Sequence, residues 1–322
     1  MAIEAVVERR PNEEGESSRL QAQAVTPERG NRAGLYFYVV TPYSDRGDVD
    51  TGVLGEYVSE ITRSGVTGIT CIASTCEGPY LTDDERNLVI DTVSRRVGGR
   101  VELNIGVGAV STRQAIEYSK RARDAGATSL MLEFPQYFPI EFEAVYRHYE
   151  AVANAVALPI RLYNIPLPTR FDFTPDRLLR MAEIAAIQSV KDASGDVTRL
   201  RDIRMLCGDR FALLCGLHFQ VLDGLRLGAD GWEVMTHPVI TKDLIHLYET
   251  LRADPWSADG ERMYQRLQPL FYFFRQFGVP QSIKAISAWT DLKLGQPRAP
   301  LQTLSPASMS RLRQIVEQLG IL

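Results

Sequence analysis

The sequence predicts an α/β protein: a (β/α)8 TIM barrel with a C-terminal helical extension. From residue 35 onward, short apolar runs alternate with amphipathic stretches, and eight such pairs precede residue 252. Each pair takes up roughly 25–30 residues, the size of one βα unit. Eight parallel strands are the number that closes a barrel. An open, doubly wound sheet is the alternative, and the absence of a GxGxxG turn after the first run counts against it.

The expected strands are short and apolar on both faces, as buried parallel strands are. They cover residues 35–41, 67–74, 101–107, 129–134, 159–164, 187–192, 211–216 and 231–235.

Between these runs, apolar residues recur with the helical period. The expected helices cover residues 53–64, 83–97, 112–125, 140–155, 175–184, 197–206, 219–227 and 242–252. Two of them begin with clear signals, because Thr82 and Glu85 form a capping box and Thr174 precedes Pro175. Helices expected over 258–277, 280–289 and 306–319 have no strands between them.

The chain therefore divides into three expected parts. Residues 1–33 are polar and lack periodicity, so we expect a flexible arm without a secretory signal. The barrel takes residues 34–252, and a helical appendage takes 253–322.

Composition points to a small-molecule partner. The formal charge is −4 and no long run of like charges occurs, so neither nucleic acid nor a membrane is an expected partner. No apolar run is long enough to cross a bilayer, and we expect a cytoplasmic protein. The four histidines are scattered and the four cysteines form no CxxC pair, so no metal is expected. No phosphate loop or dinucleotide motif is present either.

Functional groups of such barrels lie at the C-terminal ends of strands and in the loops beyond. Here those positions hold Thr41, Ser74, Thr75, Tyr163, Asn164, Lys191, Gly216 and Glu233.

Lys191 is one of only five lysines and stands at the end of an apolar run. Burial lowers the pKa of an amine, and a free amine condenses with a ketone to an iminium that assists cleavage of the adjacent C–C bond. The alternative is that Lys191 points outward or pairs with Asp192.

The other candidates have a functional and a structural interpretation each. Tyr163 could shuttle a proton beside Lys191, or simply pack. Ser74 and Thr75 could hold a carboxylate, or form an ordinary polar turn. Glu233 could face the barrel and bind a cationic or hydroxylated substrate or transfer protons, or point outward and pair with an arginine.

Three segments together resemble the dihydrodipicolinate synthase / N-acetylneuraminate lyase family. Residues 73–77 (ASTCE) are similar to its GTTGE signature, 163–166 (YNIP) to its YNxP motif and 191–196 (KDASGD) to its Schiff-base motif. The similarity extends from about residue 35 to the C-terminus. It implies a barrel lyase that binds pyruvate covalently, needs no other cofactor and forms a homotetramer built of dimers.

The resemblance also implies individual roles. Lys191 would be the nucleophile and Tyr163 the proton shuttle, with Ser74 in place of a relay threonine. Thr75 would hold the pyruvate carboxylate, and Tyr137 would reach the site of a partner subunit. Thr41 and Gly216 also fit the family pattern.

The departures concern the second substrate. Pro168 stands where dihydrodipicolinate synthase proper carries an arginine for that substrate's carboxylate, and 217–218 (LH) replaces the usual acidic pair. We therefore expect a different electrophile pocket.

Three functions remain open. The first is a Schiff-base aldolase or lyase acting on pyruvate or another 2-oxo acid with an aldehyde or imine co-substrate. The second is a 2-keto-3-deoxy acid dehydratase using the same Schiff base. The third is a catalytically silent barrel with a binding or regulatory role.

Overall fold

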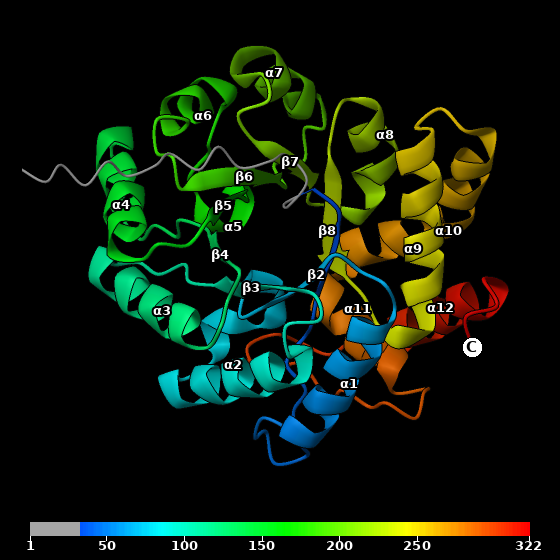
Figure 1. Cartoon of the computed structure of the whole chain (residues 1–322). Coiled ribbons are helices and arrows are strands. Elements are labelled where there is room, and N and C mark those ends of the chain that lie inside the picture. The colour runs from blue at the N-terminus through cyan, green and yellow to red at the C-terminus, as the bar shows by residue number, and fades with distance from the viewer. Residues whose placement is uncertain (1–32) are drawn as a thin grey trace, which may run out of the picture. The chain divides into compact units, whose positions relative to one another are not determined.

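The computed structural model describes residues 33–322, so the arm expected over 1–33 lies outside the described residues except for Ala33. Eight parallel strands follow one another in chain order, and β8 pairs with β1 to close a barrel. Helices surround the strands (Figure 1). The predicted (β/α)8 fold is confirmed.

Each strand lies within a predicted apolar run, and most are shorter than that run. They are β1 Leu35–Tyr38, β2 Gly68–Cys71, β3 Glu102–Gly106, β4 Ser129–Leu132, β5 Ile160–Asn164, β6 Ile187–Asp192, β7 Ala212–Cys215 and β8 Gly231–Met235. The clearest difference is after β2, where residues 72–74 were expected to continue the strand. Ile72 has a φ of 63°, in the left-handed region that a β-branched residue rarely adopts, and this turn ends the strand early.

The helices of the barrel units also lie close to their expected positions, apart from the short helix over Pro166–Thr169, which was not predicted. They are α1 Thr51–Arg63, α2 Asp83–Val97, α3 Thr112–Asp124, α4 Phe142–Ala155, α5 Pro166–Thr169, α6 Pro175–Met181, α7 Thr198–Cys207, α8 Val221–Arg226 and α9 Pro238–Ala253. Helix α9 begins four residues earlier than predicted. The His237 ring accepts a hydrogen bond from the Val239 N–H, and Pro238 occupies the first helical position. Both features mark the start of a helix, and neither is visible in the spacing of apolar residues.

The C-terminal helices pack onto the barrel. They are α10 Ala258–Phe277, α11 Val279–Ser287 and α12 Pro306–Gln318, and α11 contacts both β8 and the short 3-10 turn η2 Ser74–Cys76. The Lys284 amine on α11 lies 2.6 Å from the carboxylate of Glu77, and both side chains are buried. The same carboxylate accepts a hydrogen bond from the Arg298 N–H at 2.9 Å. The last third of the chain thus holds the loop that follows β2.

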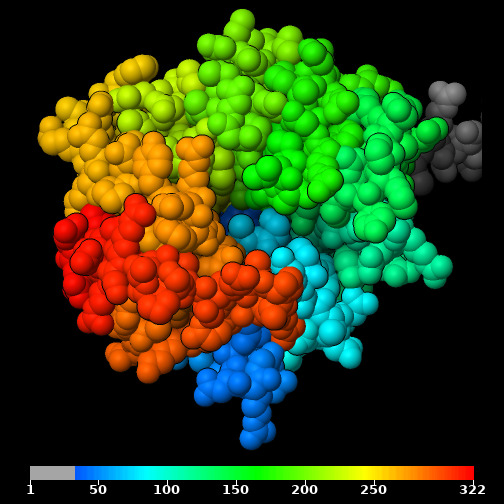
Figure 2. Space-filling model, turned by 180° about the vertical axis from the view of Figure 1, so that it is seen from behind, coloured from blue at the N-terminus to red at the C-terminus, as the bar shows by residue number. Residues whose placement is uncertain are grey.

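One face of the molecule is hollowed at its centre. Figure 2 shows residues of the first barrel units, in blue and cyan, lying deep between the green segment and the orange C-terminal helices. The C-terminal helices therefore border this hollow.

Candidate active site

Lys191 lies inside the barrel, with 2% of its surface exposed. Its amine donates a hydrogen bond to the Tyr38 hydroxyl at 2.7 Å and lies 4.2 Å from the centre of the Tyr163 ring. Burial lowers the pKa of Lys191 to about 8, and the negative charge of Glu233 opposes this shift. About a tenth of the amine is therefore uncharged at pH 7, far more than for an ordinary lysine. The outward orientation considered for Lys191 is wrong.

Tyr163 is the register partner of Lys191 on the neighbouring strand. Burial raises the pKa of its phenol, which therefore carries its proton at neutral pH. The Ser74 hydroxyl lies close enough to lower that pKa, but it is buried without a hydrogen bond of ordinary geometry. These three side chains come from β6, β5 and the η2 turn, and the barrel brings them together.

Thr41 and Gly216 support the site through their contacts. The Thr41 hydroxyl donates to the Cys76 carbonyl at 2.7 Å. This hydrogen bond ties the segment after β1 to the η2 turn that carries Thr75. A Cβ at Gly216 would lie 2.8 Å from Cε of Lys191, so only glycine leaves room for that side chain. Thr75 itself is half-buried within η2.

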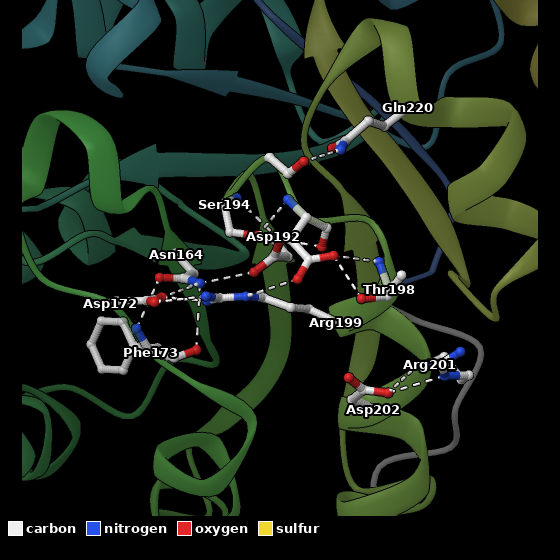
Figure 3. A network of polar contacts seen from close by, with 12 residues as sticks. Asn164, Asp172, Phe173, Asp192, Ser194, Thr198, Arg199, Arg201, Asp202 and Gln220 are labelled. Atoms are coloured by element: carbon white, nitrogen blue, oxygen red, sulfur yellow. Dashed lines mark hydrogen bonds and ion pairs between the residues drawn. The ribbon is translucent and has the colours of Figure 1, made fainter.

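A polar network fixes the loop after β6 (Figure 3). Asp192 accepts hydrogen bonds from the Asn164 amide at 2.8 Å and from the Ser194 hydroxyl at 2.6 Å. Asn164 also accepts from the Phe173 N–H at 3.0 Å, and the Gln220 amide donates to the Gly195 carbonyl at 2.7 Å. Because successive residues of a strand face opposite sides, Asp192 anchors the outside of β6 while Lys191 faces inward. The alternative pairing of Lys191 with Asp192 is thus wrong.

Glu233 combines one part of each interpretation, the inward orientation of the first and the arginine partner of the second. It faces the barrel interior, but it is fully buried and pairs with Arg161 at 3.0 Å. Its other oxygen accepts from the Thr70 hydroxyl, and the Asn104 amide lies 3.4 Å away. Register places this ion pair deeper than Lys191, since Arg161 precedes Tyr163 by two residues on β5. The expectation that Glu233 binds substrate is corrected: it is an interior charge that acts on Lys191 through space.

Tyr137, unlike the buried residues of this group, is 82% exposed to solvent. Its ring contacts only the neighbouring Phe138 among the aromatic rings of the described residues, with 5.0 Å between centroids. Within the described part of one chain, Tyr137 makes no hydrogen bond or ring contact with Lys191.

A cavity of about 470 Å³ lies beyond the C-terminal ends of β2 to β5. Its lining includes Ser74, Pro168 and Thr169, so the proline that replaces an arginine does border it. Its lining also includes two charged residues that the sequence analysis missed, Arg86 and Glu133. Tyr38, the hydrogen-bond partner of Lys191, was missed as well. The available signal was a tyrosine or carboxylate within an apolar run, since Tyr38 is the last residue of β1 and Glu133 directly follows β4.

No group of side chains suited to a metal ion occurs among residues 33–322. Within the same range, none of the helices has both the length and the apolar character needed to span a membrane.

Comparison with known proteins places the chain in a family. A model of the dihydrodipicolinate synthetase family matches residues 31–319. The 4-hydroxy-tetrahydrodipicolinate synthase of Sodalis glossinidius is 32% identical over 293 residues, which cover 90% of this chain and 99% of the relative. That of Syntrophobacter fumaroxidans is 31% identical over 290 residues, with 90% and 99% covered.

Solved structures agree. A dihydrodipicolinate synthase from Agrobacterium tumefaciens has a TM-score of 0.84 at 29% identity, covering 90% of this chain and 99% of that one. The chloride-inhibited enzyme from Acinetobacter baumannii, in complex with pyruvate, has a TM-score of 0.83 at 29% identity, with 90% and 99% covered. The expectation of a class I lyase is confirmed at the level of the family: this chain belongs to the dihydrodipicolinate synthetase family.

Proposed function

We propose that this enzyme condenses Lys191 with pyruvate and uses the resulting iminium and enamine to form or cleave a C–C bond. The observation that carries the proposal is the position of the Lys191 amine, which is buried beside Tyr38 and Tyr163 and has a pKa lowered to about 8. The neutral amine attacks the ketone, and water leaves to give the iminium. No cofactor besides this covalent link takes part.

The surrounding residues have distinct proposed roles. Tyr163 shuttles the proton during iminium formation, because its protonated phenol is adjacent to the amine. Ser74, whose buried hydroxyl lies close enough to the Tyr163 phenol to lower its pKa, relays that proton. Thr75 holds the carboxylate of pyruvate, and Gly216 leaves the space that Lys191 needs.

A homo-oligomer, a dimer or tetramer, completes the proposal. Its support is the exposure of Tyr137 and Phe138, 82% and 70%, because two large adjacent aromatic side chains seldom face solvent without a partner. In an assembly of this kind Tyr137 contributes to the site of the partner subunit. Sedimentation equilibrium of the full chain and of Tyr137→Ala measures whether this pair stabilises the assembly.

Reductive trapping tests the function. The protein is incubated with pyruvate and borohydride, and its intact mass is measured beside Lys191→Ala and Lys293→Ala, the latter a control at an exposed lysine. We expect a reduced pyruvyl adduct on the parent and on Lys293→Ala and none on Lys191→Ala. No adduct on the parent would contradict the proposal. Product analysis on 2-keto-3-deoxy acids then distinguishes cleavage from loss of water.

A further inference from the structure

Glu133 is the residue immediately after β4, and β4 pairs with β5, the strand that carries Tyr163. Leu132 pairs in register with Leu162, and Tyr163 pairs with Lys191. Positions 133, 163 and 191 therefore lie side by side on three consecutive strands. Neighbouring strands are about 4.8 Å apart, so the backbones at the two outer positions are separated by about 10 Å.

The side chain of Glu133 faces the inside of the barrel. Two residues earlier, the Met131 sulfur accepts a hydrogen bond from the Tyr38 hydroxyl in the interior, and Ser129 donates to the interior Asn104. Because side chains alternate along a strand, Glu133 continues this inward series. It is 7% exposed and lines the same cavity as Ser74.

The carboxyl group has unused hydrogen-bonding capacity. Its Oε2 is buried and makes no hydrogen bond. Leaving a buried polar atom without a partner is costly, so this oxygen beside a cavity is available to a ligand that donates a hydrogen bond. Gly108 leaves the room that the Glu133 side chain itself occupies, because a Cβ there would lie 2.5 Å from Cδ of Glu133.

The charges around Glu133 come from several elements. Burial raises its pKa, while Arg86 and Lys191 lower it. The other titratable groups that interact with it are Tyr38, Cys76, Tyr149 and Tyr163. Arg86 lines the same cavity, and its Nε is also buried without a partner. The carboxyl thus has two cations, Arg86 and Lys191, that stabilise its charged form.

We propose that Glu133 is a second proton-transfer residue, which acts on the oxygen of an aldehyde co-substrate. This inference rests on the proposed Schiff-base function and assigns the second half of that reaction. Lys191 and Tyr163 act on the ketone, and Glu133 acts on the aldehyde at the opposite end of the three aligned positions.

The enamine carbon attacks the aldehyde carbon, a C–C bond forms, and the carbonyl electron pair moves to the oxygen. The Glu133 carboxylic acid gives its proton to that oxygen and becomes a carboxylate, which Arg86 stabilises. Water then hydrolyses the iminium and releases a 4-hydroxy-2-oxo acid. In the reverse direction the carboxylate removes the proton from the 4-hydroxyl, and the C–C bond breaks toward the enamine.

The test compares Glu133→Gln with the parent and with Glu150→Gln, the same substitution at an exposed position on α4. Two readouts are needed: borohydride trapping with pyruvate, and pyruvate release from 4-hydroxy-2-oxoglutarate and 2-keto-3-deoxygluconate across pH 5–9. We expect all three proteins to be trapped equally. At saturating substrate, where formation of the Schiff base no longer limits the rate, Glu133→Gln should release pyruvate at least about 100-fold more slowly and lose the acidic limb of the pH profile.

The outcomes separate the two proposals. No adduct on the parent overturns the Schiff-base function itself. If the parent is trapped, release by Glu133→Gln within threefold of the parent, with an unchanged pH profile, overturns the role of Glu133. Equal loss of trapping and release in Glu133→Gln also overturns it, because that result marks a residue needed only to shape the site.

Discussion

Arg161 and Glu233 form an ion pair of 3.0 Å in the interior of the barrel, and neither side chain is exposed. Removing one member of a buried pair leaves an uncompensated charge and costs about 3–5 kcal/mol. We expect Glu233→Gln to lower the free energy of unfolding by about that amount in urea titrations. The double variant Arg161→Met/Glu233→Gln should recover part of the loss. A stable Glu233→Gln with only a raised KM would instead restore the substrate-binding role.

The rate of Schiff-base formation should depend on pH through Lys191. The neutral amine is the nucleophile, and the pKa of Lys191 is lowered to about 8. The trapping rate at low pyruvate concentration should therefore rise about tenfold per pH unit from pH 6 toward 8 and level off above. Stopped reactions analysed by intact mass measure it. A profile still rising steeply between pH 9 and 10 would contradict the lowered pKa.

Lys191 should also reduce the stability of the fold. Its pKa of about 8 lies below the ordinary 10.5, so between these values the unfolded chain binds a proton that the folded chain lacks. Stability due to Lys191 therefore rises with pH across this window and is lowest below pH 8. At pH 7, Lys191→Met should be more stable than the parent by about 3 kcal/mol, and the difference should shrink toward pH 10. Urea unfolding at both pH values tests this.

Tyr38 should influence the rate without being needed for folding. Its hydroxyl accepts from the Lys191 amine at 2.7 Å. Loss of one hydrogen bond corresponds to about 1–1.5 kcal/mol, so Tyr38→Phe should slow trapping about tenfold. Tyr36→Phe is the matched control, because the Tyr36 hydroxyl donates to Glu102 rather than to Lys191. Equal rates for Tyr38→Phe and the parent would show that this hydrogen bond does not orient the amine.

Gly216 offers a steric test of the same side chain. A Cβ there would lie 2.7 Å from the Asp192 carbonyl and 2.8 Å from Cε of Lys191, so Gly216→Ala must displace one of them. We expect at least about tenfold slower trapping and a loss of about 1–3 kcal/mol in stability. Gly52→Ala serves as control, since its Cβ would meet only the Asp50 carboxylate, at 3.3 Å. Unchanged trapping in Gly216→Ala would mean that the loop moves aside.

The sequence was sufficient for the barrel and for the core of the site. Apolar runs located every strand, and the position of Lys191 at the end of an apolar run made it a candidate catalyst, while its inward orientation is seen only in the closed barrel. Strand ends were less predictable, since the left-handed turn at Ile72 follows from packing in three dimensions.

The interior charges could not be paired from sequence alone. Arg161 and Glu233 are 72 residues apart, and only barrel closure brings them together. Glu133 was hidden for a related reason: it closes an apolar run, and nothing local distinguishes a carboxyl that faces a cavity from one paired with an arginine.

The contacts of Glu77 also determine when the loop after β2 can be held in place during synthesis of the chain. This residue follows the Ser74–Cys76 turn, but its partners Lys284 and Arg298 are made more than 200 residues later, Arg298 being 221 residues along the chain. A nascent chain that has completed all eight strands on the ribosome still lacks both. The loop that carries Ser74 and Thr75 can therefore gain these contacts only after the C-terminal helices have been synthesised and have left the ribosomal tunnel.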